Sequence, residues 1–302
     1  MTGSRAPLDA GLLDAIIVGG SYAGMSAALQ LARARRQVLV IDTGEPRNRM
    51  AAHSHGFLGH DGSPPADIVV AARRQLLAYP TVAWREDRAI EASQPQPRRF
   101  AVRCQSGAQF QARCLVLAHG VVDELPAIDG LAERWGKAIF HCPYCHGYEL
   151  ERGRIGVLSC ADSETGAQAL LLSEWGSVTL FCERRKGEAL DPRLATHGVV
   201  VERTPIRRIS GKATVELVDG RGRELDAIFV PPASHLAGPL AEQLGCELED
   251  GGCITTDAAK QTTVEGVFAC GDNARKAGSI ALAVGEGALA GVAAHHALMD
   301  ML

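Results

Sequence analysis

The chain has 302 residues with a formal net charge of -4, and 46% of its residues are hydrophobic. This length is enough for two domains with a sizeable core, and the slight negative charge gives no reason to expect nucleic acid or an anionic membrane as a partner. The N-terminus shows no signal peptide, and apolar runs such as DAIIVGG and VLVID have the length of strands, not of membrane spans. We therefore expect a cytoplasmic protein without nucleic-acid or membrane partners.

A strand–turn–helix–strand unit is predicted over residues 14–42. DAIIVGG is typical of a buried strand, SYAGMSAALQLARARR repeats small and apolar residues at helical spacing, and QVLVID predicts the next strand. The turn places Gly19, Ser21 and Gly24 in the GxGxxG arrangement of dinucleotide sites, with serine at the middle position, and the unit ends on Asp42. Gly19 allows a tight turn, Gly24 allows close helix–strand packing, and Asp42 can bind a ribose. The pattern favours a dinucleotide site over a doubly wound domain without a ligand.

The next stretch, AAHSHGFLGHDG, carries His53, His55 and His60. An HxH pattern alone is a weak metal signal, and no cysteine or carboxylate cluster supports it, so we predict no metal site. Residues 97–122 predict a β-meander that ends in the buried strand LVLAHG. Residues 123–140 and 231–240 are expected to connect this region to and from a second unit.

The nine cysteines are odd in number and scattered, unlike the framework of a secreted disulfide-rich protein. Only Cys142 and Cys145, in HCPYCHGYE, have CxxC spacing. A zinc site typically needs a second ligand pair, which is absent, and a glutaredoxin carries CPYC near the start of a domain of about 100 residues. The segment predicts a redox-active dithiol. Pro143 favours a helix start that would stabilise a thiolate, and His146 is expected to take up a proton near neutral pH.

A second strand–helix–strand unit is predicted over residues 154–183, from RIGVLSC, AQALLLSEWG and SVTLFCE. Its turn lacks the glycines of the fingerprint and carries Asp162 and Glu164 where a pyrophosphate would approach. The sequence therefore predicts a repeated architecture in which the second phosphate site is lost. Cys160, Cys182 and Cys270 fall at strand ends and are expected to be small buried hydrophobic residues.

The C-terminal region predicts a strand, GVFACGD, that ends at Gly271 and Asp272. SIALAVGEGALAGVAAHHAL then predicts a long helix whose alanines and glycines suit close packing. His295 and His296 are expected on this helix as packing or surface residues.

Two nested Rossmann units, a CxxC motif opening the second, and a strand ending in Gly-Asp before a terminal helix together resemble the thioredoxin reductase family over essentially the whole chain. The resemblance implies an α/β fold of two nested Rossmann-like (three-layer ββα) domains, the second inserted into the first. It implies a discontinuous FAD-binding domain, residues 1–122 and 241–302, and a degenerate pyridine-nucleotide-like domain, residues 123–240, that carries the CxxC motif. FAD as cofactor and a homodimer are further implications.

The same resemblance assigns cofactor contacts. Gly19, Ser21 and Gly24 would meet the FAD pyrophosphate, Asp42 the adenosine ribose, and Asp272 the ribityl chain. Ile280 and Ala281 would place backbone amides near the flavin pyrimidine ring. LAHG stands where the family has an Ala-Thr-Gly motif, so His119 replaces the threonine. Gly120 and Gly271 complete the expected cofactor-binding residues. His55 is expected on the substrate or flavin side.

Two features depart from the NADPH-dependent members. The second unit ends in Cys182, Glu183 and Arg184 where those members have His-Arg-Arg, and Glu183 would repel a 2′-phosphate. His146 stands where the reductases have an acid after CxxC. Both departures occur in FAD-dependent dithiol oxidases, which carry CxxCHG, close disulfides in small natural products such as gliotoxin and holomycin, and pass electrons to oxygen.

The resemblance therefore implies a dithiol oxidase acting on a small-molecule or peptide dithiol. The substrate would attack the disulfide at Cys142, Cys145 would pass electrons to FAD, His146 would carry protons, and oxygen would become hydrogen peroxide. Two alternatives stay open. One is an NAD(P)H- or ferredoxin-dependent reductase of a thioredoxin-like protein, and the other is a flavin-binding redox sensor without enzymatic turnover.

Overall fold

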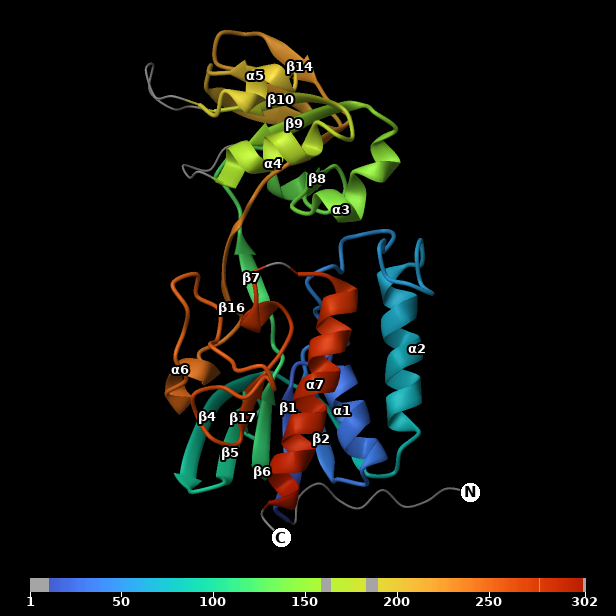
Figure 1. The fold of residues 1–302 in the computed structure, drawn as a ribbon, viewed down its shortest axis with the longest axis vertical. Helices are drawn as coiled ribbons and strands as arrows, with labels where there is room; N and C mark the ends of the chain where they lie inside the picture. The colour runs from blue at the N-terminus through green and yellow to red at the C-terminus, as the bar shows by residue number, and fades with distance from the viewer. Residues whose placement is uncertain (1–10, 159–163, 183–189, 277, 301–302) are drawn as a thin grey trace.

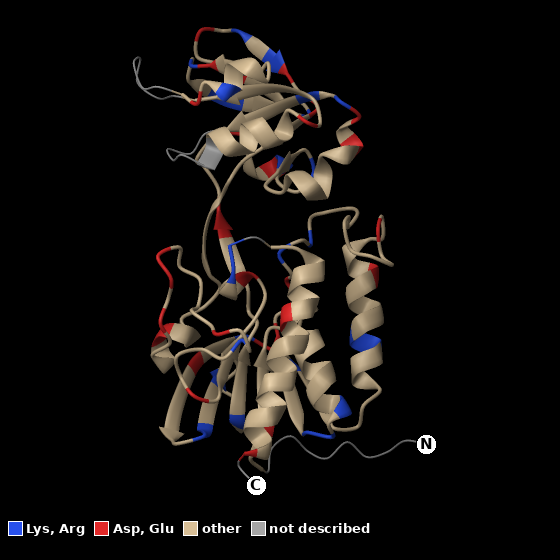
Figure 2. Cartoon of the chain, in the orientation of Figure 1, with Lys and Arg blue, Asp and Glu red and all other residues tan. Residues whose placement is uncertain are grey.

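The computed structural model describes residues 11–158, 164–182, 190–276 and 278–300. They form two α/β parts joined by two antiparallel strands, β7 (Val121–Glu124) and β16 (Ala233–Leu236) (Figure 1). The lower part in Figure 1 contains the first and the last of the described residues, and the upper part contains the CxxC motif. Charged residues of both signs are interspersed over both parts (Figure 2).

A seven-stranded sheet forms the lower part. Its strands are β1 (Leu13–Val18), β2 (Val38–Asp42), β3 (Val82–Glu86), β4 (Ala89–Gln96), β5 (Arg99–Cys104), β6 (Gln109–Leu117) and β17 (Val267–Ala269). The order is β3-β2-β1-β6-β5-β4, and β17 pairs with the C-terminal half of β6. β4 and β5 form an antiparallel hairpin, and β5 also runs antiparallel to β6, whereas the other pairs are parallel. β1 is central and its residues 15–17 are fully buried, as expected of a parallel strand covered on both faces.

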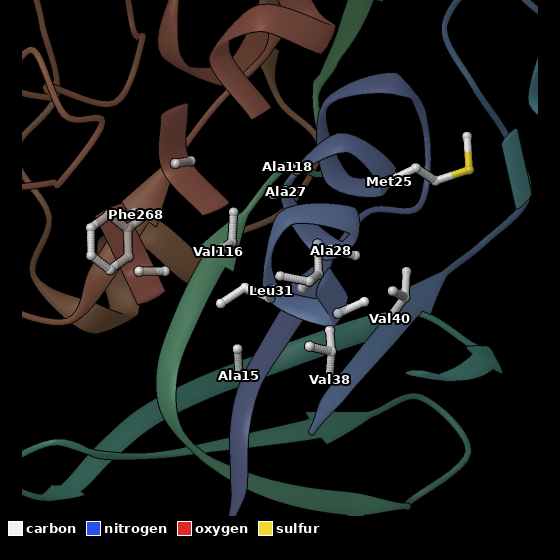
Figure 3. Packing of buried hydrophobic residues seen from close by; sticks show 14 of the residues in the cluster. Ala15, Met25, Ala27, Ala28, Leu31, Val38, Val40, Val116, Ala118 and Phe268 are labelled. Carbon is white, nitrogen blue, oxygen red and sulfur yellow. The ribbon is translucent and has the colours of Figure 1, made fainter. Parts of the chain in front are cut away.

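Three helices pack together beside this sheet: α1 (Tyr22–Arg33), α2 (Pro65–Leu77) and α7 (Ile280–Met299) (Figure 1). The short α6 (Leu240–Leu244) contacts β4. On α1, Ala27 and Leu31 lie one turn apart and face the sheet, where they join Val116 of β6 and Phe268 of β17 in one buried cluster (Figure 3). This helical spacing of small and large apolar residues is the pattern from which α1 was predicted.

The upper part contains a five-stranded parallel sheet and a three-stranded antiparallel sheet. The first has the order β11-β10-β9-β15-β8, and the second the order β12-β13-β14. The strands are β8 (Ile139–Phe140), β9 (Arg154–Leu158), β10 (Ser177–Phe181), β11 (Val200–Glu202), β12 (Ile206–Ser210), β13 (Thr214–Leu217), β14 (Gly222–Glu224) and β15 (Ala227–Phe229). The helices are η1 (Ala132–Arg134), α3 (Pro143–His146), η2 (Tyr148–Leu150), α4 (Glu164–Leu172) and α5 (Arg193–Thr196), with η3 (Asp272–Ala274) in the lower part.

The α/β fold with Rossmann-like units is thus confirmed. β9, α4 and β10 form the second strand–helix–strand unit, although α4 begins and ends earlier than predicted. The predictions for Cys160, Asp162, Glu183 and Arg184, and for the side chain of Glu164, lie outside the described residues. Cys182 and Cys270 are buried, as expected.

The two connections are more ordered than the sequence suggested. Residues 123–140 and 231–240 were expected to be simple connections, but they contribute to β7, η1, β8 and β16. In the β7–β16 ladder, Ser234 also donates a side-chain hydrogen bond of 2.8 Å to Asp123. The two crossings of the chain are therefore held together by hydrogen bonds.

The long helix rich in alanine and glycine that the sequence predicted is confirmed as α7. By length and composition this helix could cross a membrane, so the statement that apolar runs have only strand length is wrong for it. In the structure α7 packs lengthwise against α1, and its Glu286 accepts hydrogen bonds from Lys260 at 2.7 Å and Arg275 at 3.4 Å.

Two glycines of α7 allow that packing. A Cβ on Gly287 would lie 2.1 Å from the carbonyl oxygen of Ala23, and one on Gly291 would lie 2.5 Å from the carbonyl oxygen of Ala27. Real side chains do not approach backbone so closely, so both positions require glycine at this helix separation.

We predict that Gly287→Ala lowers the free energy of unfolding by about 1–3 kcal/mol, because the methyl group forces α7 away from α1. Gly285→Ala is the matched control, since a Cβ there meets nothing within 4 Å; helix propensity should make it neutral or slightly stabilising. Urea unfolding followed by circular dichroism measures both. Equal midpoints for the two variants would contradict the close packing.

Candidate functional site

The carboxyl ends of β1, β6 and β17 meet at one edge of the seven-stranded sheet. Ala118 donates from its backbone N–H to Val18 at 2.7 Å, and Cys270 donates to Leu117 at 3.1 Å. The chain leaves these strands through glycines with positive φ, which are Gly19 (+101°), Gly120 (+70°) and Gly271 (+82°). In doubly wound sheets this edge is where ligands bind.

The fingerprint turn is sterically tight. A Cβ on Gly19 would lie 2.2 Å from the carbonyl oxygen of Ala118, and one on Gly24 would lie 1.8 Å from that of Gly19. These two glycines therefore have the steric roles that the sequence predicted. Ser21 is the N-cap of α1, yet its hydroxyl makes no capping bond, which leaves it available to a ligand.

Asp42 holds the same turn in place. Its Oδ1 accepts a hydrogen bond from Gly20 N–H at 2.7 Å, and its Oδ2 accepts one from Gly44 N–H at 3.0 Å. Each carboxylate oxygen has a second lone pair, so these bonds still allow a ribose hydroxyl to donate to Asp42.

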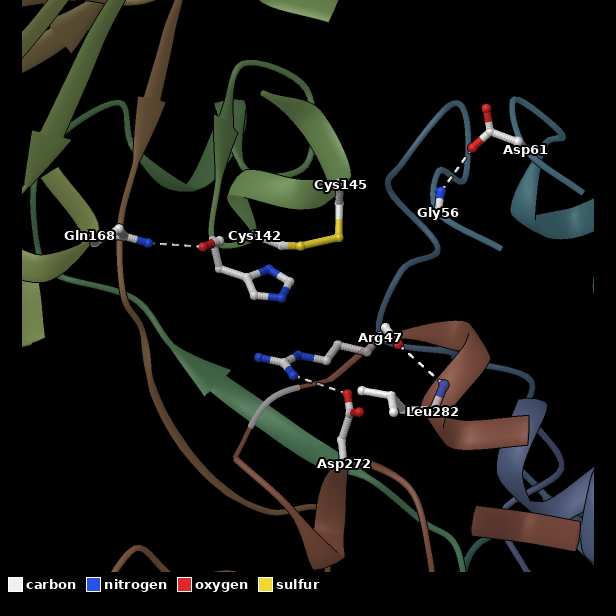
Figure 4. The surroundings of a disulfide bond; sticks show 10 residues. Arg47, Gly56, Asp61, Cys142, Cys145, Gln168, Asp272 and Leu282 are labelled. Carbon is white, nitrogen blue, oxygen red and sulfur yellow. Dashed lines mark hydrogen bonds and ion pairs between the residues drawn. A yellow bond between two sulfur atoms is a disulfide. The ribbon is translucent and has the colours of Figure 1, made fainter. Parts of the chain in front are cut away.

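Arg47 joins three separate segments at the upper rim of this edge. Its Nη1 donates to Oδ2 of Asp272 at 2.9 Å, while Nε and Nη2 donate to the two oxygens of Asp123 at 2.9 and 2.6 Å. Figure 4 shows Arg47 and Asp272 below the CxxC disulfide. Burial alone would raise the pKa of Asp123, but the bonds from Arg47 lower it overall. This arginine could not be identified from sequence, because its partners are distant in the chain.

The turn after β17 is fixed from α7. Glu286 accepts a hydrogen bond from the N–H of Gly271 at 3.1 Å while it pairs with Lys260 and Arg275. Ile280 and Ala281 form the first turn of α7, and Ser279 caps the helix by accepting from the N–H of Leu282 at 3.2 Å. The first amides of α7 have no carbonyl within the helix to bond, so they can serve a ligand.

The residues at this edge fit FAD. The turn before α1 offers backbone amides to a pyrophosphate. Two buried polar atoms nearby have no hydrogen-bond partner among the described residues: Oδ1 of Asn48, whose amide donates to Tyr22 on α1, and Nε1 of Trp84, whose ring lies against Gly20. Buried polar atoms are rarely left unpaired, so they indicate where a polar ligand completes the bonding.

In the upper part, Cys142 and Cys145 form a disulfide with a Cα–Cα distance of 5.3 Å. Cys142 is the N-cap of α3 and Pro143 is its first residue, as predicted. α3 is a single turn, so its dipole can stabilise a thiolate only weakly. His146 ends α3 and stacks on Phe140, with ring centroids 4.0 Å apart.

His146 does not titrate near neutral pH in this state, contrary to the sequence expectation. Burial, and after it the neighbouring His141 and His55, lower its pKa from 6.5 to about 4. The ring is therefore neutral at pH 7 and can accept a proton. A thiolate formed beside it would favour the imidazolium and raise the pKa, so proton uptake by His146 is coupled to opening of the disulfide.

His141 directly precedes Cys142 in the chain, and its imidazole is close enough to Arg47, Asp123 and Asp272 to be influenced by their charges. Burial lowers its pKa first and Arg47 lowers it further, whereas Asp123 and Asp272 act in the opposite direction. Its backbone carbonyl accepts a hydrogen bond from Gln168 of α4 at 3.0 Å (Figure 4). A neutral imidazole is thus held on each side of the cysteine pair.

His55 connects the lower part to the CxxC segment. Its Nδ1 lies 3.4 Å from Oε1 of Glu149, three residues after His146, and 3.6 Å from Oδ1 of Asp61. The structure thus places His55 beside the segment that follows CxxC, while His53 and His60 are exposed. No group of three or more His, Cys, Asp or Glu residues that could hold a metal ion occurs in the described ranges.

A family model described as pyridine nucleotide-disulphide oxidoreductase matches residues 13–287. The chain belongs to this family. It is therefore an oxidoreductase, and the expectation of FAD as cofactor is confirmed by the family and consistent with the fit above.

Several known proteins match nearly the whole chain. Thioredoxin reductase sirT of Leptosphaeria maculans is 32% identical over 307 residues, covering 93% of this chain and 92% of the relative. A solved oxidoreductase from Agrobacterium tumefaciens is 50% identical, with a TM-score of 0.91, and covers 96% of this chain and 99% of its own. HlmI, whose crystal structure is known, is 35% identical, with a TM-score of 0.89, and the match covers 96% of this chain and 93% of HlmI. The predicted likeness to thioredoxin reductases is confirmed.

His119 stands where thioredoxin reductases have a threonine, and its burial has a measurable effect on stability. Both ring nitrogens are buried and have no partner among the described residues. Burial lowers the pKa of this histidine from 6.5 to about 4. Between these values the unfolded chain binds the proton and the folded protein does not, so stability falls as the pH drops through this window.

We predict that the folded protein loses about 2 kcal/mol of stability from His119 alone between pH 7 and pH 5. His119→Thr should remove that part of the pH dependence. His197→Gln, at an exposed histidine, should leave it unchanged. Urea unfolding of the three proteins at both pH values measures the difference, and an unaltered pH dependence in His119→Thr would show that the buried ring is not held neutral.

Proposed function

We propose that the chain is an FAD-dependent dithiol oxidase that closes a disulfide in a small-molecule or peptide dithiol, with oxygen as acceptor and hydrogen peroxide as product. The observation that carries this proposal is the position of His146. It directly follows Cys145 of the Cys142–Cys145 disulfide in the chain, and burial keeps its imidazole neutral. With a pKa of about 4 the imidazole is a weak base while the disulfide is closed, but a thiolate formed beside it raises that pKa, so the neutral ring can take a proton as the disulfide opens.

We assign FAD to the lower part, residues 1–122 and 241–302, and the dithiol to residues 123–240. The fingerprint turn would hold the pyrophosphate, Asp42 the ribose, and Asp272 the ribityl chain. The amides of Ile280 and Ala281 would lie near the flavin ring. The assigned cofactor residues are Gly19, Ser21, Gly24, Asp42, Gly120, Gly271, Asp272, Ile280 and Ala281.

The reaction divides into thiol exchange and electron transfer. A substrate thiolate attacks Cys142 and breaks the bond to Cys145, and the second substrate thiol then displaces Cys142 to leave a substrate disulfide. His146 takes the proton of the attacking thiol. When bound, FAD supplies the acceptor for the two electrons of the enzyme dithiol. The overall balance is R(SH)2 + O2 → RS2 + H2O2.

A disulfide reductase of a thioredoxin-like protein is the second candidate. The relative from Leptosphaeria maculans carries the name thioredoxin reductase. This activity would need an electron donor, NAD(P)H or ferredoxin. The sequence of the second turn, without fingerprint glycines before Gly166, speaks against the nicotinamide version.

The test is an anaerobic titration of the yellow protein, followed at the flavin absorbance band. Dithiothreitol should bleach the flavin, NADPH and NADH should not, and air should restore the colour with one peroxide formed per dithiol. Fast bleaching by a nicotinamide would overturn the proposal in favour of the reductase. Bleaching by dithiol without sustained turnover in air would instead support a redox sensor.

Cys145→Ser is the matched control for this titration. The variant keeps the cofactor residues but lacks the disulfide, so dithiothreitol should bleach its flavin at least about a hundredfold more slowly, since no covalent path to the flavin side remains. Bleaching at the wild-type rate would show that the thiol reduces the flavin directly and that the CxxC pair is not used.

We further propose a cytoplasmic homodimer. The described cysteines outside the CxxC pair are free and buried, which suits a reducing compartment. α7 is nearly uncharged (Figure 2) and exposes four large apolar residues, Leu282, Leu289, Val292 and Met299. They are seven, three and seven positions apart, which places them on one face of the helix.

Leu289→Asp should convert the dimer to a monomer in light scattering, because it places a charge in the apolar stripe. Val70→Asp on α2 is the control, since Val70 is also apolar and 66% exposed but lies on a different helix. A wild-type monomer, or a Leu289→Asp dimer, would refute this arrangement.

A further inference from the structure

We propose that one loop of the lower part, residues 47–55, fastens the upper part in place throughout the reaction. This fixed arrangement admits small dithiols to the CxxC pair and excludes the dithiols of folded proteins. The inference rests on the proposed oxidase function and narrows its substrate class. Arg47, Met50 and His55 are positioning residues in this sense, because they determine specificity without touching the substrate.

The first contact of the loop is the ion pair of Arg47. Its guanidinium donates to both oxygens of Asp123 on β7, the strand that leads into the upper part, and to Asp272 in the lower part. The side chains of Arg47 and Asp123 are only 22% and 9% exposed, so water competes weakly for this pair. Bidentate pairs of arginine and carboxylate fix the orientation of their partners as well as their distance. The start of the upper part is therefore held beside the turn assigned to the cofactor.

The second contact joins the loop to the upper part itself. A Cβ on Gly136 would lie 2.5 Å from Cβ of Met50, so the two segments touch at this point. Gly136 has a φ of +74° and donates its N–H to Ile139 at 2.8 Å, which ties its position to that of β8. Glycine allows this close approach because it has no side chain. Met50 thus packs on the segment that leads through β8 to the CxxC motif.

The third contact lies after the CxxC motif. Nδ1 of His55 is 3.4 Å from Oε1 of Glu149, which belongs to η2. The loop is braced here, because Ser54 and Ser63 pair as an isolated antiparallel bridge with a hydrogen bond of 2.8 Å. The three contacts thus reach the chain both before and after the CxxC pair. A rotation of the upper part would have to break all of them.

The arrangement that these contacts hold already suits electron transfer. In Figure 4 the disulfide lies on the side of α3 that faces Arg47 and Asp272, and the turn that carries Asp272 is assigned to the cofactor. The reduced cysteines therefore need no movement of the upper part to face the cofactor side. Relative motion is the usual expectation for two domains with a small interface, so the three contacts are the reason to infer a fixed arrangement here.

The same arrangement limits which thiol can reach the disulfide. Thiol exchange requires the attacking sulfur to contact Cys142 directly. Cys142 and Cys145 are only partly exposed, and α3 lies directly above the lower part in Figure 1. A small molecule or a short peptide can approach along the boundary between the two parts, a common place for small-ligand sites. A cysteine pair on a folded protein brings its whole domain along, and that domain collides with the lower part.

The first experiment compares two dithiols of the same chemistry and different size. Anaerobic flavin bleaching of the holoenzyme is followed with reduced thioredoxin and with a short peptide that carries the CxxC sequence of that thioredoxin. Thioredoxin should bleach the flavin at least about a hundredfold more slowly than the peptide, because a steric clash discriminates against the larger partner. Equal rates for the two would overturn the exclusion of folded proteins.

Arg47→Ala tests whether the fastening causes the exclusion. Loss of the partly buried ion pair frees the upper part, so thioredoxin should bleach the flavin of this variant at least about tenfold faster than that of the wild type. FAD is kept in excess, since Arg47 also bonds Asp272. Arg49→Ala is the matched control, because Arg49 is exposed and donates to the carbonyl of Pro46 within its own loop. An Arg47→Ala variant as selective as the wild type would remove Arg47 from the determinants of specificity.

A covalent cross-link tests whether the arrangement stays fixed during the reaction. Met50→Cys and Lys137→Cys place thiols at two exposed positions beside the contact of Met50 with Gly136. Consecutive Cα atoms are only about 3.8 Å apart, so a short bismaleimide can join the two thiols. In the oxidised protein the CxxC pair is protected as a disulfide, and the described free cysteines are buried.

The thioether cross-link survives dithiothreitol, so the joined protein can be assayed directly. Its flavin should be bleached by dithiothreitol within about threefold of the rate of the same variant capped with N-ethylmaleimide, because no domain movement limits the reaction. A loss of more than about tenfold would show that the upper part has to move during the reaction and would overturn the inference.

The outcomes separate this inference from the proposed function. Bleaching of the wild type by dithiothreitol and recovery in air, together with fast bleaching by thioredoxin or an inactive cross-linked protein, would overturn the fixed arrangement and leave the oxidase intact. If dithiothreitol fails to bleach the wild-type flavin, the oxidase falls, and the restriction on its substrates falls with it.

Discussion

The hydrogen bonds of Arg47 are the constraint on which the arrangement of the site depends. Its two carboxylate partners, Asp123 and Asp272, lie 76 and 225 residues away in sequence, one on the strand that leads to the CxxC part and one on the turn assigned to the cofactor. Three partly buried charges are stable there only as a set, because loss of one would leave the others without compensation. The planar guanidinium bonds both carboxylates at once, a geometry that lysine cannot reproduce.

Burial, more than charge, sets the protonation of the histidines. His119, His141 and His146 all have lowered pKa values, and desolvation is the first cause in each. A cysteine pair flanked by neutral imidazoles has bases beside it that gain a proton only when negative charge appears on sulfur. The same residue types on an exposed loop would be partly charged at pH 7 and would lack this dependence on the redox state of the disulfide.

Local motifs predicted much of the molecule, and contacts between distant segments account for what they missed. Gly19 and Gly24 could be assigned because the spacing of a turn is a property of a few consecutive residues. His146 could be identified from the motif, but its pKa depends on stacking with Phe140 and on His55, which belongs to the other part of the chain. Arg47 carries no local pattern at all. The long helix α7 was predicted, but the need for glycine at Gly287 and Gly291 depends on its packing against α1, a segment far away in the chain.

The pairing of β7 with β16 has a consequence for how the chain can be altered. Paired strands lie about 5 Å apart, so the segment between them leaves and re-enters the lower part at nearly the same point. The segment between β7 and β16 could therefore be replaced by another folded unit whose two ends lie close together, without a change in the strand pairing of the seven-stranded sheet. The covalent connection between the lower and upper parts is therefore confined to this one pair of strands, and each sheet can diverge in sequence with little effect on the packing of the other.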